Sequence, residues 1–467
     1  MNKKPNIVFF FTDDQRFDTI CALGNDAIIT PNLDKLVKRG TTFTHAHIPC
    51  GTSPAVCMPS RAMLNSGRKL FSIEGAGENI PENHTTIGEA LQKNGYNTFG
   101  TGKWHNGKKA FNRSFSDGAE IFLGGMMDQW NVPAFDYDPS GKYDSACLQT
   151  PEPHRSNKTI EIPCDHIKSG KHSSELLCEA AIERINNCDS DKPFYMYISF
   201  LAPHDPRTMP QKFKDMYDPE QIELPENFLG GHPFETGALE IRDELLASFP
   251  RRPDETKEHI AEYYAMITHL DDQLGLVVKS LQDKGILDDT IIVFAGDNGL
   301  ALGQHGLFGK QNCYEHSVRV PLIFAGPGIP ENKRTSAQAY LFDIFPTLCQ
   351  LTGADIPESV EGLSLTRAMS EPVECVRKSM YFAYCEFQRA VKKDNFKLIE
   401  YVFEGKHIQT QLFDLEKDPK EIKSLANLPE HSEKISELRA EMLKLRNEWN
   451  DLGSTWGKAF WKAINWT

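Results

Sequence analysis

Long apolar runs are missing from this sequence, and no segment approaches the roughly 20 residues that a membrane-spanning helix requires. The first strand-like stretch begins at Asn6, and no apolar segment of the kind that directs secretion precedes it. We therefore expect no membrane association. We also expect a cytoplasmic protein, or a periplasmic or secreted one if a signal has been removed from the chain.

Positive charge is in deficit. The chain carries 51 Lys and Arg against 65 Asp and Glu, a net charge of −14. Broad binding to nucleic acid or to a membrane surface requires a basic face, so we expect neither partner. A small anionic substrate is not excluded, because a local pocket of Lys, Arg, His and metal can override the charge of the whole surface.

Paired cysteine motifs are also absent. The 11 cysteines are odd in number and scattered, with no Cys-x-x-Cys pair, which argues against a disulfide scaffold or a structural zinc site. We find no internal repeat and no low-complexity segment. With 467 residues, 40% of them hydrophobic and 25% charged, the chain fits a soluble globular protein with one large and one smaller domain, or two ordinary domains.

Apolar β-branched and aromatic runs alternate with helical stretches along most of the chain. The run at 6–11 does not alternate with polar residues, as expected for a strand buried on both faces of a sheet. This order indicates an α/β fold, with a large, mainly parallel mixed sheet sandwiched by helices. The expected strands are 6–11, 96–99, 194–200, 290–294 and 321–324, and the expected helices are 86–94, 173–187, 258–284 and 339–352.

The pattern changes from about Glu374 onward. Short strand-like segments separated by polar turns are followed by one charged helix. We therefore predict a main domain over 1–370 and a C-terminal α+β subdomain, an antiparallel sheet with a helix, over 371–467. The expected strands of this subdomain are 380–386, 389–392, 396–401 and 411–414, and its expected helix is 432–449.

Polar side chains follow four of the expected main-domain strands at the point where each strand ends. In open α/β sheets, ligands gather outside the carboxyl ends of the strands, so we expect these side chains to share one rim. They are Asp13 and Asp14 after the first strand, Lys103 and His105 after the second, His204 after the third, and Asp297 and Asn298 after the fourth.

Four of these residues offer oxygen ligands: Asp13, Asp14, Asp297 and Asn298. Three carboxylates and an amide favour a hard cation, Ca²⁺ or Mg²⁺, over zinc. Taken alone, each Asp motif also fits a polar turn or a helix cap. Their convergence at equivalent strand ends favours the metal site.

Cys57 lies in a loop rich in Pro and Ser that leads into the helical stretch 62–64. Pro59 suits the first turn of a helix, where its missing N–H costs nothing. A side chain at this place faces the positive end of the helix dipole, which favours an anion. The alternative is one more buried thiol among eleven.

The run Cys57-Met58-Pro59-Ser60-Arg61 resembles the Cys-x-Pro-x-Arg signature of type I sulfatases, in which a maturation enzyme oxidises the cysteine to formylglycine. The resemblance covers nearly the whole chain and implies the fold of the alkaline phosphatase superfamily. At the variable position, Met58 is less usual than a small residue. The matching motifs, in the family's order, are Asp13-Asp14, Cys57–Arg61, Gly102–His105, Pro203-His204, Asp297-Asn298-Gly299 and Gly306–Lys310.

The resemblance implies a role for each motif residue. The hydrated aldehyde at position 57 would attack sulfur, and a cation held by Asp13, Asp14, Asp297, Asn298 and residue 57 would assist it. The remaining roles are orientation of residue 57 by Arg61, sulfate binding by Lys103 and Lys310, protonation of the leaving alkoxide by His204, proton removal by His105, and a substrate contact by His305.

The resemblance also implies a substrate class. Bacterial sulfatases with a similar stretch from Leu302 to Gln311 often act on sulfated carbohydrates, so we expect a sulfated sugar, such as a 2-O-sulfated uronate from a glycosaminoglycan. The segments 117–171 and 221–254, together with parts of the C-terminal unit, are expected to shape the outer pocket. Two alternatives stay open: a phosphonate monoester or phosphodiester hydrolase with the same nucleophile, and a non-catalytic homologue that binds anionic glycans.

Overall fold

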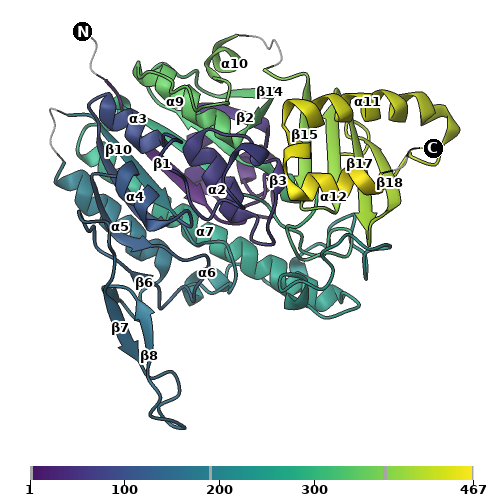
Figure 1. The fold of residues 1–467 in the computed structure, drawn as a ribbon. Helices are drawn as coiled ribbons and strands as arrows, with labels where there is room; N and C mark the ends of the chain where they lie inside the picture. The colour runs from purple at the N-terminus through teal and green to yellow at the C-terminus, as the bar shows by residue number, and fades with distance from the viewer. Residues whose placement is uncertain (1–3, 189–191, 372–375, 465, 467) are drawn as a thin grey trace.

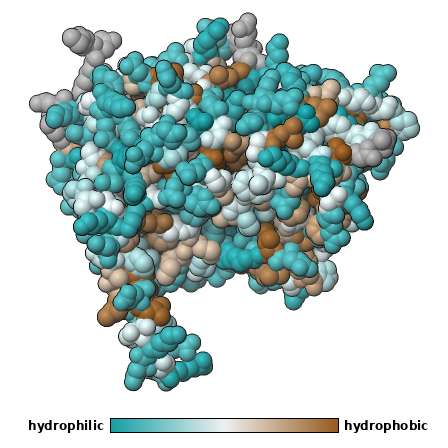
Figure 2. Space-filling view, viewed as in Figure 1, coloured by the Kyte–Doolittle hydropathy of each residue, from teal (hydrophilic) through white to brown (hydrophobic). Residues whose placement is uncertain are grey.

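The computed structural model describes residues 4–188, 192–371, 376–464 and 466. Two sheets organise the chain, a large one in the main body and a smaller one near the C-terminus (Figure 1). Within the described ranges, none of the helices combines the length and the apolar character needed to cross a bilayer. The visible face is mostly hydrophilic, with small apolar patches scattered over it (Figure 2).

The large sheet has nine strands in the order β12-β2-β13-β11-β1-β10-β4-β5, with β14 also paired to β2. The five strands from β11 to β5 are parallel to one another, whereas β13 is antiparallel to both of its neighbours. The predicted mainly parallel mixed sheet is therefore confirmed. Its strands are β1 (Asn6–Thr12), β2 (Gly40–His47), β4 (Asn97–Lys103), β5 (Asp117–Phe122), β10 (Phe194–Ser199), β11 (Thr290–Gly296), β12 (Arg319–Val320), β13 (Leu322–Ala325) and β14 (Lys333–Tyr340).

Helices cover both faces of this sheet. In β1, Phe9 belongs to the core that includes Leu64 of α2 and Leu348 of α9, whereas Phe10 belongs to the core that includes Leu270 of α7. Burial on both sides explains why the strand is apolar without alternation. One layer contains α2 (Cys57–Ser66), α3 (Ile87–Lys93), α4 (Lys108–Ser114) and α9 (Ile344–Thr352), and the other contains α1 (Pro31–Arg39), α5 (Ser173–Asn186) and α7 (Pro253–Asp283).

The smaller sheet has the order β18-β17-β16-β15-β3. Four of its strands are antiparallel and come from the C-terminal part, but β3 (Cys50–Gly51) comes from the N-terminal part and pairs with β15 in parallel. The predicted α+β architecture is therefore confirmed, while the domain boundary near 370 stays a prediction. The other elements are β15 (Ser379–Tyr384), β16 (Gln388–Lys393), β17 (Phe396–Phe403), β18 (Lys406–Asp414), α11 (Ser432–Glu448) and α12 (Thr455–Ala463).

Several elements were not predicted from the sequence. The expected helix at 339–352 begins as strand, because β14 extends to Tyr340 and α9 starts only at Ile344. A hairpin of β7 and β8 projects from the body at the lower left (Figure 1). The remaining short elements are β6 (Pro133–Ala134), β7 (Ala146–Gln149), β8 (Ile160–Pro163), β9 (His166–Ile167), α6 (Gln211–Lys214), α8 (Glu315–Val318) and α10 (Thr366–Ser370).

A buried ion pair joins the smaller sheet to the C-terminal helices. Asp451 accepts hydrogen bonds from Arg389 of β16 at 2.7 and 2.9 Å, from Tyr381 at 2.7 Å and from Trp461 of α12 at 2.8 Å. We expect Asp451→Ala to lower the free energy of unfolding by about 3–5 kcal/mol, because it leaves the Arg389 charge buried without a partner. Denaturant unfolding followed by tryptophan fluorescence measures this loss.

Asp283→Ala is the matched control, since it breaks an exposed pair with Lys279 and should leave the unfolding midpoint nearly unchanged. Replacing both members of the buried pair, in Arg389→Met with Asp451→Leu, should recover much of the lost stability. Equal midpoints for Asp451→Ala and the unsubstituted protein would contradict a structural role for the pair.

Candidate active site

The acidic residues lie at the carboxyl ends of β1 and β11. The register pairs Thr12 with Gly296, so Asp13 and Asp297 leave adjacent parallel strands at the same level. Asp14 adopts a φ of 65°, which is uncommon for a residue other than glycine, and its N–H donates to Asp297 Oδ1 at 3.0 Å. The strand register and this hydrogen bond together hold three carboxylates in one buried cluster.

Each of these carboxylates is paired with one cation. The pairs are Asp13 with Lys103, Asp14 with Lys310 at 2.5 Å, and Asp297 with Arg61 at 2.8 Å. All six side chains are almost fully buried. The cluster is thus balanced in formal charge, and burial is tolerated because every charge has an opposite partner.

Burial and neighbouring charges shift the pKa values of Asp13 and Asp297 in opposite directions. Burial together with the negative charge of Asp13 raises the pKa of Asp297 to about 7. Burial also raises the pKa of Asp13, but the positive charge of Lys103 and other nearby groups outweighs it and holds that pKa below its usual range. Two like charges at short range thus disfavour simultaneous ionisation unless a further cation is present.

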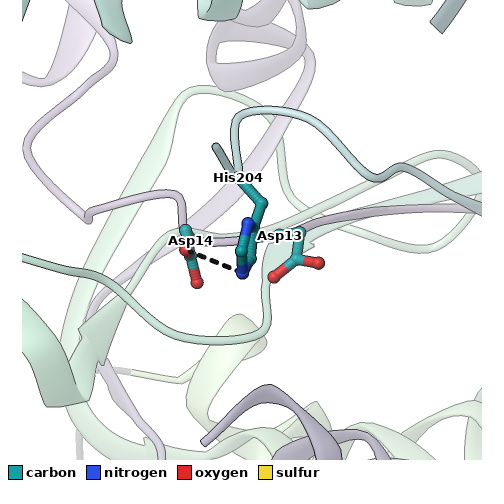
Figure 3. Close-up of side chains that lie close together, drawn as sticks. All are labelled: Asp13, Asp14 and His204. Atoms are coloured by element: carbon teal, nitrogen blue, oxygen red, sulfur yellow. Dashed lines mark ion pairs between the residues drawn. The ribbon is translucent and has the colours of Figure 1, made fainter. Parts of the chain in front are cut away.

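The oxygen atoms of this cluster fit a divalent cation. Asp13 Oδ1 and Asn298 Oδ1 are buried and have no hydrogen-bond partner, while Asn298 Nδ2 donates to Asp14 Oδ1 at 2.6 Å. Unpartnered buried acceptors call for a donor or a cation. Two groups of three residues could hold an ion, because the ligand atoms within each group all lie within 4.8 Å of one another. The first group is Asp13, Asp14 and His204 (Figure 3), and the second is Asp13, Cys57 and Asp297.

Cys57 is the first residue of α2 and is buried beside this cluster. Its Sγ lies 3.5 Å from Lys103 Nζ and 3.5 Å from His105 Nδ1. Burial raises the pKa of the thiol, although Lys103 and Lys310 act in the opposite direction. The unmodified side chain therefore stays protonated and is a poor nucleophile at neutral pH.

Arg61 is fully buried one helical turn after Cys57. We expected its guanidinium to orient residue 57, but its hydrogen bonds go to Asp297, to the Lys103 carbonyl at 3.0 Å and to Ser199 Oγ at 2.6 Å. A buried guanidinium requires a carboxylate partner, and Asp297 supplies it. Its Nη2 has no hydrogen-bond partner but lies 3.7 Å from Asp13 Oδ2, so Arg61 forms ion pairs with two of the carboxylates.

The two histidines predicted as acid and base both lie at the cluster. Burial, reinforced by the positive charges of Lys103 and Arg61, lowers the pKa of His105 to about 2, which keeps this ring neutral. His204 Nε2 lies 3.7 Å from Asp14 Oδ2 (Figure 3). Its Nδ1 is 2.8 Å from the Asp205 carbonyl oxygen. Two imidazoles thus lie at the site, His105 beside Cys57 and His204 beside Asp14.

A cavity of about 230 Å³ opens over this cluster. Four of the predicted site residues line it, namely Cys57, His105, His204 and Lys310. Its other lining residues are Pro54, Ala55, Gly125, Met126, Ile241, Arg242, Asp243 and Gln311. The structure therefore brings the predicted nucleophile, acid–base and cationic groups together at one pocket.

His305 does not join them. Its ring stacks on Tyr314 with centroids 4.0 Å apart, and its Nε2 lies 3.1 Å from Asn227 Nδ2. It does not line the cavity over Cys57. His305 is close to Lys310 in sequence, but its side chain contacts Tyr314 and Asn227, whereas Lys310 lines the cavity and binds Asp14.

The sequence motifs missed the residues of the outer wall. Arg242 and Asp243 lie in the segment 221–254, which was expected to shape the pocket but held no recognisable pattern. Gln311 follows Lys310 directly, and its Nε2 donates to the Pro54 carbonyl at 2.6 Å and to Asp243 Oδ2 at 2.7 Å. Only the structure shows that Gln311 joins three segments of the pocket wall.

Comparison with protein families gives two matches. The sulfatase family model matches residues 5–354, and the model of the C-terminal region of N-sulphoglucosamine sulphohydrolase matches residues 303–448. The first match alone includes all residues of the carboxylate cluster and Cys57.

Two proteins of similar sequence and one solved structure of similar fold are consistent with the family match. An arylsulfatase of Clostridium perfringens is 30% identical, with 94% of each chain covered. An N-acetylglucosamine-6-O-sulfatase of Bacteroides thetaiotaomicron is 25% identical, covering 96% of this chain and 87% of its own. A structure solved in complex with its substrate, D-glucosamine-2-N,6-O-disulfate, shares the fold, with a TM-score of 0.77, 22% identity, and coverage of 96% of this chain and 99% of that one. The chain belongs to the sulfatase family of enzymes.

Proposed function

We propose that this protein releases inorganic sulfate from a sulfated carbohydrate, with a formylglycine made from Cys57 as the nucleophile. The observation that carries the proposal is the position of Cys57 Sγ, 3.5 Å from both Lys103 Nζ and His105 Nδ1 at the base of the cavity. The sugar-directed relative of Bacteroides thetaiotaomicron supports the substrate class. The 2-O-sulfated uronate expected from the sequence stays a prediction.

The buried thiol itself is unsuited to the reaction, because its raised pKa keeps it protonated. A hydrated formylglycine would supply the attacking hydroxyl at the same position. His105 stays neutral and can accept a proton at Nδ1 from a group at position 57. Lys103 can hold Asp13 and a substrate oxygen at once, since an ammonium group has three donors.

Asp13, Asp14, Asp297, Asn298 and the group at position 57 would hold a divalent cation, Ca²⁺ or Mg²⁺. When bound, the cation would supply Lewis-acid stabilisation of the charge on the sulfate oxygens. Lys310, buried and bound to Asp14, faces the same cavity and would bind a sulfate oxygen. His204 would hold the proton for the leaving alkoxide on the cavity side.

A maturation enzyme is the partner that this proposal requires, and mass spectrometry of the peptide containing Cys57 tests it. After co-expression with such an enzyme, the aldehyde form should weigh about 18 Da less than the cysteine form. Hydration of the aldehyde adds back about the same mass, so capture with an aminooxy probe should be included. The probe should label this peptide and no other cysteine peptide.

The control is the same protein expressed without the maturation enzyme, whose Cys57 should react with iodoacetamide after denaturation. A thiol at position 57 after competent maturation would overturn the catalytic proposal and favour the non-catalytic glycan-binding homologue.

A further inference from the structure

The outer part of the cavity differs in character from its base. At the base, Cys57 is only 2% exposed, whereas Arg242 and Met126 at the outer part are 47% and 43% exposed. A sulfate group bound at the base would therefore place the rest of its alcohol against this outer wall. The chemistry of the wall should then select the alcohol.

The one cation of the outer wall is already neutralised. Asp205 binds the guanidinium of Arg242 through both carboxylate oxygens, one of them 2.9 Å from Nη1. Asp243 Oδ1 accepts a further hydrogen bond from Nη1 at 3.3 Å. Asp205, Arg242 and Asp243 together carry a formal charge of −1, and Asp243 is the carboxylate of this group that lines the cavity.

Burial raises the pKa of Asp243, but Lys310 and other neighbours outweigh it and lower that pKa, so Lys310 offsets part of the negative charge although Asp14 binds it. Among the described residues that line the cavity, the remaining Lys or Arg is Lys310, which Asp14 holds at the base. A carboxylate on the sugar ring would thus meet Asp243 without a free cation to bind it. Like charges placed together in a partly buried site oppose binding.

Asp243 is well placed to accept a hydroxyl group. Its side chain is 17% exposed and lines the cavity, and its Oδ2 accepts a hydrogen bond from Gln311 Nε2 at 2.7 Å. Each carboxylate oxygen has two lone pairs, so acceptor capacity is left for a substrate. The wall also offers apolar surface for the C–H face of a ring, from Pro54, Ala55, Met126 and Ile241.

We propose that the ring carrying the sulfate ester is uncharged apart from the sulfate, as in a hexose or an N-acylated hexosamine, and that Asp243, positioned by Arg242 and Gln311, accepts a hydrogen bond from one of its hydroxyl groups. This inference rests on the proposed sulfatase activity. It selects against the uronate that the sequence suggested, because a uronate carries a second negative charge.

Matured enzyme and matched sugars test the inference. Methyl glucoside and methyl glucuronide would each be tested as the 2-O-sulfate and, separately, as the 3-O-sulfate. The two sugars differ only at C6, which is a neutral hydroxymethyl group in the glucoside and a carboxylate in the glucuronide. N-acetylglucosamine 6-O-sulfate adds a neutral ring that is sulfated at another position. We expect kcat/KM for the best neutral sugar to exceed that of either uronate by about 100-fold or more. The substrate 4-nitrophenyl sulfate, which has no sugar hydroxyls, is the internal reference.

The variant Asp243→Asn keeps the shape of the wall and removes its negative charge. It should lower the ratio of kcat/KM for the best neutral sugar to kcat/KM for 4-nitrophenyl sulfate by about 10- to 100-fold. It should also lower the ratio of kcat/KM for that sugar to kcat/KM for the uronates. Glu240→Gln, which removes an exposed carboxylate three residues away, should leave both ratios unchanged.

The possible results distinguish a failure of this inference from a failure of the proposed sulfatase function. Faster cleavage of a uronate than of its neutral partner, or an unchanged ratio in Asp243→Asn, would overturn the inference alone. Cleavage of 4-nitrophenyl sulfate without cleavage of any sugar would do the same and leave sulfatase activity standing. Release of sulfate from none of these compounds by protein carrying formylglycine would overturn the proposed function and the inference together.

Discussion

Cys57→Ala should abolish sulfate-ester hydrolysis, with kcat at least about 10⁵-fold below that of the matured enzyme. The side chain at position 57 lies against Lys103, His105 and the carboxylate cluster at once. Alanine has no thiol, so residue 57 could not be converted to the aldehyde whose hydrate would supply the attacking hydroxyl. The variant should keep the fold, because the change removes a single sulfur atom at the edge of a cavity.

Initial rates on 4-nitrophenyl sulfate, with circular dichroism as the check on folding, measure this effect. Cys21→Ala is the matched control, since that thiol is part-exposed and lies outside the site, so it should retain full activity. The unsubstituted chain without maturation should be as inactive as Cys57→Ala, because burial keeps its thiol protonated. Activity above about 1% in Cys57→Ala would exclude residue 57 as the nucleophile.

Removal of divalent cations should have the second largest effect, a fall in kcat/KM of about 1,000-fold or more. The structure leaves Asp13 Oδ1 and Asn298 Oδ1 buried without partners, next to two further carboxylates. A cation bound to these oxygens also stabilises the folded state, because it binds the native chain in preference to the unfolded one. Chelation should therefore lower the Tm as well as the activity.

Adding Ca²⁺ and Mg²⁺ separately to the chelated protein would show which ion restores each property. In Asp297→Ala the ion should no longer raise the Tm, whereas Asp243→Asn, which changes only the outer wall, should keep the full shift. Undiminished activity after exhaustive chelation, verified by elemental analysis, would contradict the metal site.

Local sequence patterns predicted the central strands well. The run at 7–11 is apolar at every position because β1 is covered on both faces of the sheet. Such a run can be predicted to be a buried strand from the sequence alone. β2 was not predicted, because Gly40–His47 contains threonine and histidine among few apolar residues. Its burial depends on pairing with β12, β13 and β14, which come from nearly 300 residues later.

The candidate site was predictable where its residues directly follow strands. Asp13 and Asp297 meet because β1 and β11 are parallel neighbours in register, a consequence of the α/β architecture. The partner of Arg61 could not be predicted, since one-turn spacing from Cys57 does not reveal that Asp297 is closer. The outer wall could not be predicted either, because Asp205, Arg242 and Gln311 meet only through tertiary packing.

The pairing of β3 with β15 has a consequence for the timing of synthesis. Cys50, seven residues before Cys57, pairs with Ala383, a residue encoded more than 300 positions later. At about 5–20 residues per second, the ribosome needs some tens of seconds to supply that partner strand. During this interval β3 has no partner strand, so the segment that leads into Cys57 is not yet paired as it is in the folded protein. The proposed oxidation would therefore have some tens of seconds in which to act before the chain can fold completely.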